Sequence, residues 1–211
     1  MYEKKIIATK VLDSKSKIAS VKLTRKLIER TLKAVSTDKT RIQLTLGFWD
    51  NENKALVATD GKRLHFLQGV VVDDFFSDID VNCFVELQGN IVLLYDAGFA
   101  LFPNWQRVVP GSEKLRVIEH YIAGRTQKNI LGIDFSTKSE FEKNFSQLII
   151  LLGAPFDIGA VKDLIGGCYQ IHKNIAKDTI LNPCLLVQEE KYYKFSAVFM
   201  PMTPFSNIIE Y

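Results

Sequence analysis

The chain has 211 residues, of which 47% are hydrophobic and 24% charged, and its formal net charge is +3. This composition excludes a globally disordered protein, and a chain of this length can bury enough surface to fold without a disulfide or a metal. The longest purely apolar run, 148–152, is far shorter than the roughly 20 residues of a membrane-spanning helix. The N-terminus has no apolar signal segment, and Cys83, Cys168 and Cys184 show no paired spacing. These features predict a cytoplasmic protein with free thiols.

Charge is distributed unevenly along the chain. Residues 1–41 hold twelve Lys and Arg against four Asp and Glu, a local charge of +8, and the remaining residues sum to −5. Such an asymmetry favours an anionic partner for the N-terminal part. A lysine-rich face that is only solvated would give the same pattern.

The N-terminal part predicts two strands, at 4–12 and 17–23, followed by a helix at 24–35. Apolar side chains of the helix recur with the 3.6-residue period, and Thr24 is a candidate N-cap. Basic side chains occupy the opposite face of this helix.

The next part predicts a series of short strands. We expect strands at 41–48, 54–59, 62–72, 81–87, 90–95 and 98–102, with an acidic loop at 73–80. Asp60-Gly61 between apolar runs predicts a two-residue type I′ hairpin turn. A proline-containing connector at 102–111 places a subdomain boundary at about 110–113.

The second half has a weaker pattern. Residues 112–123 fit either a helix or a strand, and a strand at 129–136 precedes a short polar helix at 139–147. A helix at 157–165 begins with the cap candidate Asp157 and ends at Gly166-Gly167. Strands at 168–175, 183–189 and 192–199 follow. A helix followed by three antiparallel strands thus occurs twice, which predicts an α+β architecture with few helices on one face of antiparallel sheets.

No catalytic motif is present. His65, His120 and His172 are isolated, and the nucleophile-elbow, phosphate-loop and dinucleotide motifs are absent. We therefore expect neither an enzyme nor a metal or other cofactor.

Three short segments are informative together. They are LVATDGKRL at 56–64, FPNWQRVVP at 102–110 and VFMPM at 198–202. In this order they resemble the bacterial DNA polymerase III beta subunit, the sliding clamp, with its V-A-T-D-G-H-R-L hairpin, F-P-D-Y-R-R-V-(L/I)-P connector and terminal V-M-P-M. The resemblance covers roughly 20–202 in outline but only about 25 residues closely.

The resemblance implies a DNA-clamp-like fold built of α-β-β-β units. It assigns residues 1–110 to a domain like the family's second domain and 111–211 to a shortened domain like its third, with a C-terminal tail at 203–211. The chain departs from the family in four ways. A counterpart of the first domain is missing, and the helix expected before residue 102 is missing or very short. The start of the third domain is not recognisable, and the tail continues past the family's usual end.

Clamps of this family encircle duplex DNA with helices that line the hole, so contact with DNA is expected to be independent of sequence. The basic face of the first helix suits this role. The residues predicted to contact DNA are Lys22, Arg25, Lys26, Arg30 and Lys33. A solvated helix face with i,i+4 pairing, as in Glu29 with Lys33, is the alternative.

The family also has a groove that receives short peptides from polymerases, clamp loaders and repair proteins. Methionine suits a groove that serves several ligands. By motif position, the resemblance predicts groove residues Thr59, Gly61, Lys62, Arg63, Leu64, Pro110, Val198, Phe199, Met200, Pro201 and Met202. Thr203 replaces the family's arginine, and the apolar tail at 205–209 could cover the groove or contact a neighbouring subunit.

Three functional hypotheses follow. The first is a compact DNA clamp whose two domains per chain would form a ring from three copies. The second is an accessory or decoy module, of phage or mobile-element type, that keeps the groove but does not encircle DNA. The third is an unrelated α+β protein, an enzyme included, in which the three motifs are coincidental.

Overall fold

The structure is a computed structural model that describes residues 4–12, 19–109, 115–117, 119–122, 125–130, 132–152, 156–174 and 184–200. The chain divides into two compact units, which we describe separately. The first unit comprises Met1–Val108 and Val187–Val198, and the second comprises Val109–Leu186 and Phe199–Tyr211. Within the described part, no helix combines the length and the apolar character needed to cross a membrane.

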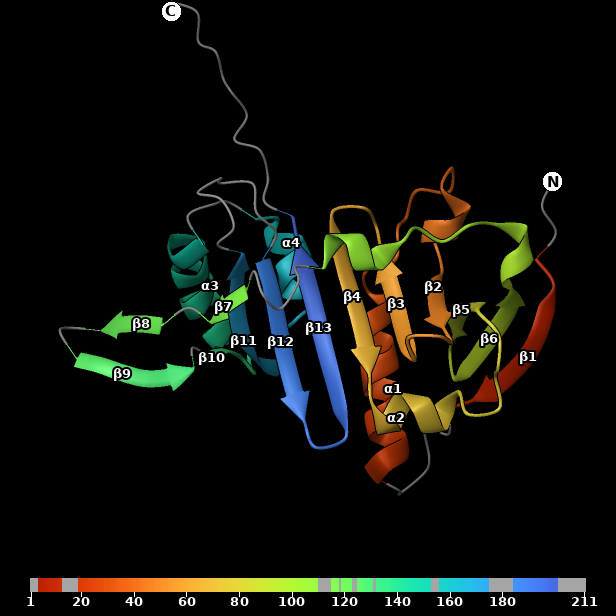
Figure 1. The fold of residues 1–211 in the computed structure, drawn as a ribbon, viewed down its shortest axis with the longest axis horizontal. Helices are drawn as coiled ribbons and strands as arrows, with labels where there is room; N and C mark the ends of the chain where they lie inside the picture. The colour runs from red at the N-terminus through yellow and green to blue at the C-terminus, as the bar shows by residue number, and fades with distance from the viewer. Residues whose placement is uncertain are drawn as a thin grey trace, which may run out of the picture. The chain divides into compact units, whose positions relative to one another are not determined.

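Antiparallel strands form the body of the first unit, and Figure 1 shows them side by side. Their order differs from the chain order, because β2 lies between β5 and β3. The strands, in order across the sheet, are β1 (Ile6–Val11), β6 (Ile91–Asp96), β5 (Cys83–Gln88), β2 (Gly47–Asp50), β3 (Ala55–Thr59), β4 (Arg63–Gln68), β13 (Tyr193–Phe199) and β12 (Cys184–Glu190). Of the last two strands, only the residues from Val187 to Val198 belong to the first unit.

Two helices pack on β3 and β4 of this unit. They are α1 (Ala19–Leu32) and the short α2 (Val70–Phe75), which also contact each other. Leu27 and Ile28 of α1 are fully buried. The helix approaches the sheet closely at Gly47, where an added Cβ would lie 2.3 Å from Cδ2 of Leu32. A larger residue at Gly47 would therefore require the Leu32 side chain to move.

The connector that follows β6 packs on the same unit through its aromatic side chains. Phe102 stacks on Phe48 with ring centroids 4.7 Å apart, and Trp105 packs against Phe66 at 5.1 Å. The Trp105 Nε1–H group donates to Oδ2 of the buried Asp50 at 2.9 Å. The conspicuous aromatic residues of the connector therefore have a packing role.

A segment from late in the chain completes the first unit. The backbone N–H of Val71 donates to the carbonyl oxygen of Tyr192 at 3.2 Å. Gly69, with φ +108°, makes this approach possible, since an added Cβ would lie 2.9 Å from that same oxygen. Arg30 of α1 donates to Gln188 Oε1 at 2.7 Å. The first unit is therefore discontinuous in sequence.

In the second unit, β11 (Gly167–Asn174) pairs antiparallel with both β10 (Gly132–Phe135) and β7 (Leu115–Val117). A separate antiparallel pair joins β8 (Glu119–Ile122) and β9 (Arg125–Ile130). The helices are α3 (Lys138–Leu152), which packs on β10, and α4 (Ile158–Lys162). Phe135 lies in the core with Phe141 and Tyr169, at ring-centroid distances of 4.9 and 6.2 Å.

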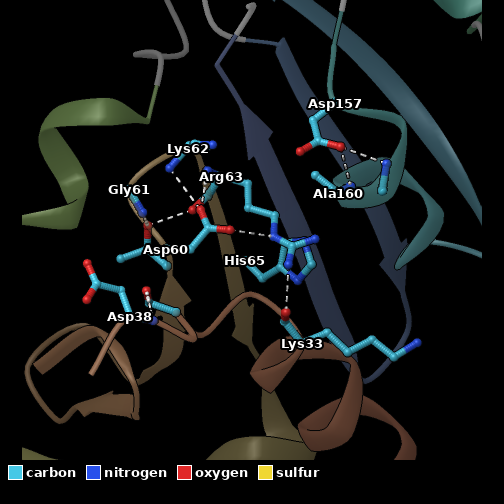
Figure 2. A network of polar contacts seen from close by, with 12 residues as sticks. Lys33, Asp38, Asp60, Gly61, Lys62, Arg63, His65, Asp157 and Ala160 are labelled. Carbon is cyan, nitrogen blue, oxygen red and sulfur yellow. Dashed lines mark hydrogen bonds and ion pairs between the residues drawn. The ribbon is translucent and has the colours of Figure 1, made fainter. Parts of the chain in front are cut away.

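The α+β class is confirmed, with antiparallel strands and four α-helices in the described part of the chain. The predicted repeat is also seen, because β2, β3 and β4 follow α1 and β11, β12 and β13 follow α4. The Asp157 cap is confirmed, since its Oδ1 accepts from Gly159 N at 2.8 Å and Ala160 N at 3.4 Å (Figure 2).

Several predicted elements are wrong. Residues 19–23 belong to α1, so the described part of the predicted strand at 17–23 is helical. Thr24 lies inside this helix and is therefore not its N-cap. The predicted strand at 98–102 is replaced by a 3₁₀ helix at Ala97–Phe99, whose start is capped by Asp96. The strand predicted to reach residue 72 ends at 68, and 70–75 form α2. The predicted helix at 139–147 is present and extends to Leu152, and of the two alternatives for 112–123 the strand is confirmed at 115–117 and 119–122.

Candidate functional site

Three lysines form one line that runs along α1 to the residue just after its end. Lys22, Lys26 and Lys33, together with Glu29, follow the spacing i, i+4, i+7, i+11, which places them on one side of the helix. All three lysines are exposed. Glu29 is engaged by Arg25, whose Nε lies 2.7 Å from Oε1. Within the described ranges the three ammonium groups have no carboxylate partner, so this lysine line presents uncompensated positive charge.

Arg30 lies elsewhere on the helix. It is only 5% exposed, its guanidinium lies 5.5 Å from the Phe195 ring centroid, and it donates to Gln188. Its predicted position on the exposed face of the helix is therefore wrong. Long-range packing of the segment at 187–198 covers Arg30, and this packing could not be inferred from helical periodicity. Arg30 is thus not accessible to a duplex in this structure.

The loop between β3 and β4 is organised by Asp60, as Figure 2 shows. Oδ1 of Asp60 accepts from Lys62 N at 2.8 Å and Arg63 N at 3.0 Å. Thr59 Oγ1 donates to the carbonyl oxygen of Arg63 at 2.6 Å. Gly61 has φ +91°, but Asp60 is not in the positive-φ region, and Thr59 pairs with Leu64. The predicted two-residue type I′ turn is therefore wrong, because the Asp60 carboxylate stabilises a longer loop.

The Arg63 side chain points back toward the protein. It is 13% exposed, and its Nε lies 3.2 Å from Asp60 Oδ2. Its Nη2 donates to the carbonyl oxygen of Lys33, at the C-terminal end of α1, at 2.9 Å. Leu64 is buried in the core, whereas Lys62 and Gly61 are exposed. Arg63 thus joins the predicted groove loop to the predicted DNA-binding helix.

The other predicted groove residues are only partly described. Val198 and Phe199 are buried, and Met200 is 43% exposed. Pro110, Pro201 and Met202 lie outside the described residues, as does the tail at 203–211. Since Val198 belongs to the first unit, and Phe199 and Met200 to the second, the complete groove stays a prediction.

Residues that the sequence analysis did not single out lie beside the loop. Arg41 Nη2 donates to the carbonyl oxygen of Asp60 at 3.2 Å, and Arg41 Nε lies 3.1 Å from Asp38 Oδ2. Lys39, in the same turn, is exposed. The only sequence signal for this turn is its place within the basic N-terminal 41 residues.

The core beneath α1 holds a buried histidine. His65 Nδ1 lies 3.2 Å from the carbonyl oxygen of Arg30, which can only accept, so this nitrogen carries the proton. Burial lowers the pKa of His65 to about 3, so the ring is neutral at physiological pH. Burial also raises the pKa of the Cys83 thiol to about 12, which makes it a poor nucleophile. Across the described residues, no group of three or more His, Cys, Asp and Glu side chains could hold a metal ion.

Comparison with solved structures identifies the fold. The chain is similar to the DNA polymerase III beta subunit of Thermotoga maritima, with a TM-score of 0.50 and 13% identity over 96% of this chain and 66% of that one. It is similar to the beta subunit of Borrelia burgdorferi, also with a TM-score of 0.50, at 11% identity over 96% of this chain and 64% of that one. The chain has a sliding-clamp-like fold. It spans about two thirds of the length of these clamps. No protein-family model and no curated protein sequence matches it.

Proposed function

We propose that this chain is a sliding-clamp-like protein that holds duplex DNA without sequence preference. The lysine line on α1, carried by a clamp-like fold, is the observation that supports the proposal. Only Lys22, Arg25, Lys26 and Lys33 of the predicted contact set are proposed, since Arg30 is buried. The role is one of binding rather than catalysis.

The spacing of the lysine line suits a phosphate backbone. Eleven residues separate Lys22 from Lys33, which corresponds to about 16 Å along a helix. Along its axis, duplex DNA presents one phosphate per strand about every 3.4 Å. A line of this length, parallel to the axis, therefore spans about five base pairs. Lysine contacts of this kind release counterions and carry no sequence information, which allows a bound protein to slide.

We also propose that the loop at 59–64 takes part in docking short peptides, together with 198–202 and Pro110, as the resemblance implies. The bonds made by Asp60 and Thr59 support this role, because a loop that is already ordered loses little entropy on binding. Peptides of DNA polymerases or clamp loaders are the proposed partners. Residues 1–110 and 111–211 are proposed as the two clamp-like domains.

Removal of the lysine line tests the DNA proposal. The triple variant Lys22→Ala, Lys26→Ala, Lys33→Ala should bind a 24-base-pair duplex about 100-fold more weakly near 0.1 M salt, measured by fluorescence anisotropy. Across a salt series, the slope of log K against log salt should become less steep by about 3, one for each lysine that neutralises a phosphate in the wild type.

A matched control separates contact from net charge. The variant Lys138→Ala, Lys143→Ala, Lys194→Ala removes the same charge from exposed lysines that lie near carboxylates. Its affinity should change less than twofold. Equal losses in the two triple variants would contradict the proposal, because the effect would then follow net charge alone.

Ring closure distinguishes the clamp from the accessory or decoy module. A trimer by light scattering, together with retention on circular but not linear DNA, supports three copies around a duplex. A concentration-independent monomer that binds clamp-binding peptides would instead support the accessory module.

A further inference from the structure

A second basic surface lies at the C-terminal end of α1. We call it the basic corner, and its exposed lysines are Lys33, Lys39 and Lys62. Arg63 joins the loop to the helix end through the carbonyl oxygen of Lys33, and Arg41 joins the same loop to the 38–41 turn through the carbonyl oxygen of Asp60. Figure 2 shows the loop and the helix end together. The lysine line and the basic corner therefore share Lys33.

The carboxylates of the basic corner are fully occupied. Asp38 accepts from the backbone N–H of Thr40 at 2.9 Å and from its hydroxyl at 2.6 Å, and these bonds hold the pKa of Asp38 below its ordinary value. Asp60 accepts from two backbone N–H groups and faces Arg63. Across the described residues, the ammonium groups of Lys39 and Lys62 have no carboxylate partner.

The corner carries a net charge of +3. Its cations are Lys33, Lys39, Arg41, Lys62 and Arg63, and its anions are Asp38 and Asp60.

The position of the loop is fixed by glycine. With φ +91°, Gly61 adopts a conformation that other residues rarely take, and an added Cβ would lie 3.1 Å from Arg41 Nη1. Arg63 meanwhile donates to a carbonyl group at the end of α1, whose partial negative charge would otherwise repel an anion. The corner thus presents positive charge from an ordered backbone.

We infer that the basic corner binds phosphate groups of the same duplex that the lysine line holds, so that the DNA-contacting surface continues from α1 to the β3–β4 loop. The inference rests on the proposed function. An acidic peptide fits the corner less well, because peptide docking depends on apolar anchors in a pocket, and of the loop at 59–64 proposed above to dock peptides only Gly61 and Lys62 belong to the exposed surface of the corner. The exposed residues at 37–41 and 61–62 are Thr, Asp, Lys, Arg and Gly, with no apolar side chain among them.

The double variant Lys39→Ala, Lys62→Ala tests this inference. Arg41 and Arg63 are kept, since they hold the corner together. The variant should bind the 24-base-pair duplex at least tenfold more weakly near 0.1 M salt, with a salt slope less steep by about 2. Lys39→Arg, Lys62→Arg should retain the wild-type slope, and Lys143→Ala, Lys194→Ala serves as the charge-matched control.

The outcomes separate this inference from the proposed function. If Lys39→Ala, Lys62→Ala behaves like the control while the lysine-line variant loses affinity, the inference is overturned and the proposed function stands. If the wild-type protein does not bind the duplex even at 50 mM salt, both fail. If the double variant loses affinity for a glutamate-rich decapeptide but not for DNA, the corner is an acidic-peptide site and the inference is overturned.

Discussion

The helices α1 and α3 are similar in length but differ in how their surface charges are matched. The lysine line of α1 has no carboxylate partner among the described residues. On α3, Lys138 lies 3.7 Å from Glu142, and Lys143 lies 3.8 Å from Glu140. Both helices carry lysines, yet only α1 presents uncompensated charge. Lysine content alone therefore does not mark a binding surface, and what matters is whether the protein already supplies the counter-charge.

The buried sides of the two helices differ as well. The buried side of α1 carries the charged Arg30, whose carbonyl oxygen contacts the neutral His65 of β4. α3 places the aromatic residues Phe141 and Phe145 in its core. The cations of α1 thus have two roles. The lysine line is exposed to solvent, whereas Arg30 is buried and binds Gln188 within the first unit.

The largest expected effect tests the difference between the buried Arg30 and the more exposed cations of α1. Arg30→Ala should lower the free energy of unfolding by about 2–4 kcal/mol, because it removes a buried charged donor from Gln188. Arg25→Ala removes a partly exposed pair with Glu29 and should cost less than about 0.5 kcal/mol. Urea denaturation of both variants measures the difference. Equal losses of unfolding free energy in the two variants would contradict a buried Arg30 that donates to Gln188.

The next effect depends on pH. The pKa of His65 falls from 6.5 to about 3 on folding, mainly through burial, and the nearby charges of Arg63 and Arg30 act in the same direction. Between these values the unfolded chain binds a proton that the folded chain does not, so stability falls as the pH is lowered. The loss due to His65 should be about 2 kcal/mol at pH 5.

Urea denaturation between pH 7.5 and 5 checks this expectation. His65→Leu should show a smaller decrease in stability over that range than the wild type, by about the same 2 kcal/mol. An identical pH dependence in the two proteins would contradict a buried, neutral His65.

The smallest effect is expected when the lysines of α3 lose their carboxylate partners and so become unpaired like those of the lysine line on α1. Glu140→Gln, Glu142→Gln frees Lys143 and Lys138 from their partners, and affinity for duplex DNA should rise about threefold, from roughly one added phosphate contact. Glu52→Gln, Asp80→Asn makes the same change in net charge without freeing these lysines. If both variants gain affinity equally by fluorescence anisotropy, unmatched charge on a helix is not the deciding feature.

The sequence predicted the packing face of α1 but not where the helix begins. Leu27 and Ile28 follow the helical period and are buried as expected. Upstream, residues 20–23 alternate polar and apolar side chains, which fits a strand locally. The continuous turns of α1 prevail over this short pattern from Ala19 onward.

At the candidate site, the sequence likewise predicted the position of the β3–β4 loop but not its conformation. Asp60-Gly61 located the turn between β3 and β4 correctly, because glycine was needed for a positive φ. The longer loop depends on the Asp60 carboxylate and on contacts from Arg41 and Arg63. Two of these contacts reach residues 19 and 30 positions away in the chain, so the dipeptide alone could not reveal them.

The sequence by itself determined the α+β class, the basic face of the first long helix and the motifs of the sliding clamp. These features are local, because periodicity, turn residues and short motifs are set by neighbours in the chain. Only the tertiary structure decided that Arg30 is buried beneath residues 187–198 and that Phe102 and Trp105 pack on the first unit. It also decided that Arg41 and Arg63 join the β3–β4 loop to the 38–41 turn and to the carbonyl oxygen of Lys33. Each of these outcomes depends on contacts between residues distant in sequence, whose pairing follows from the packing of the whole unit.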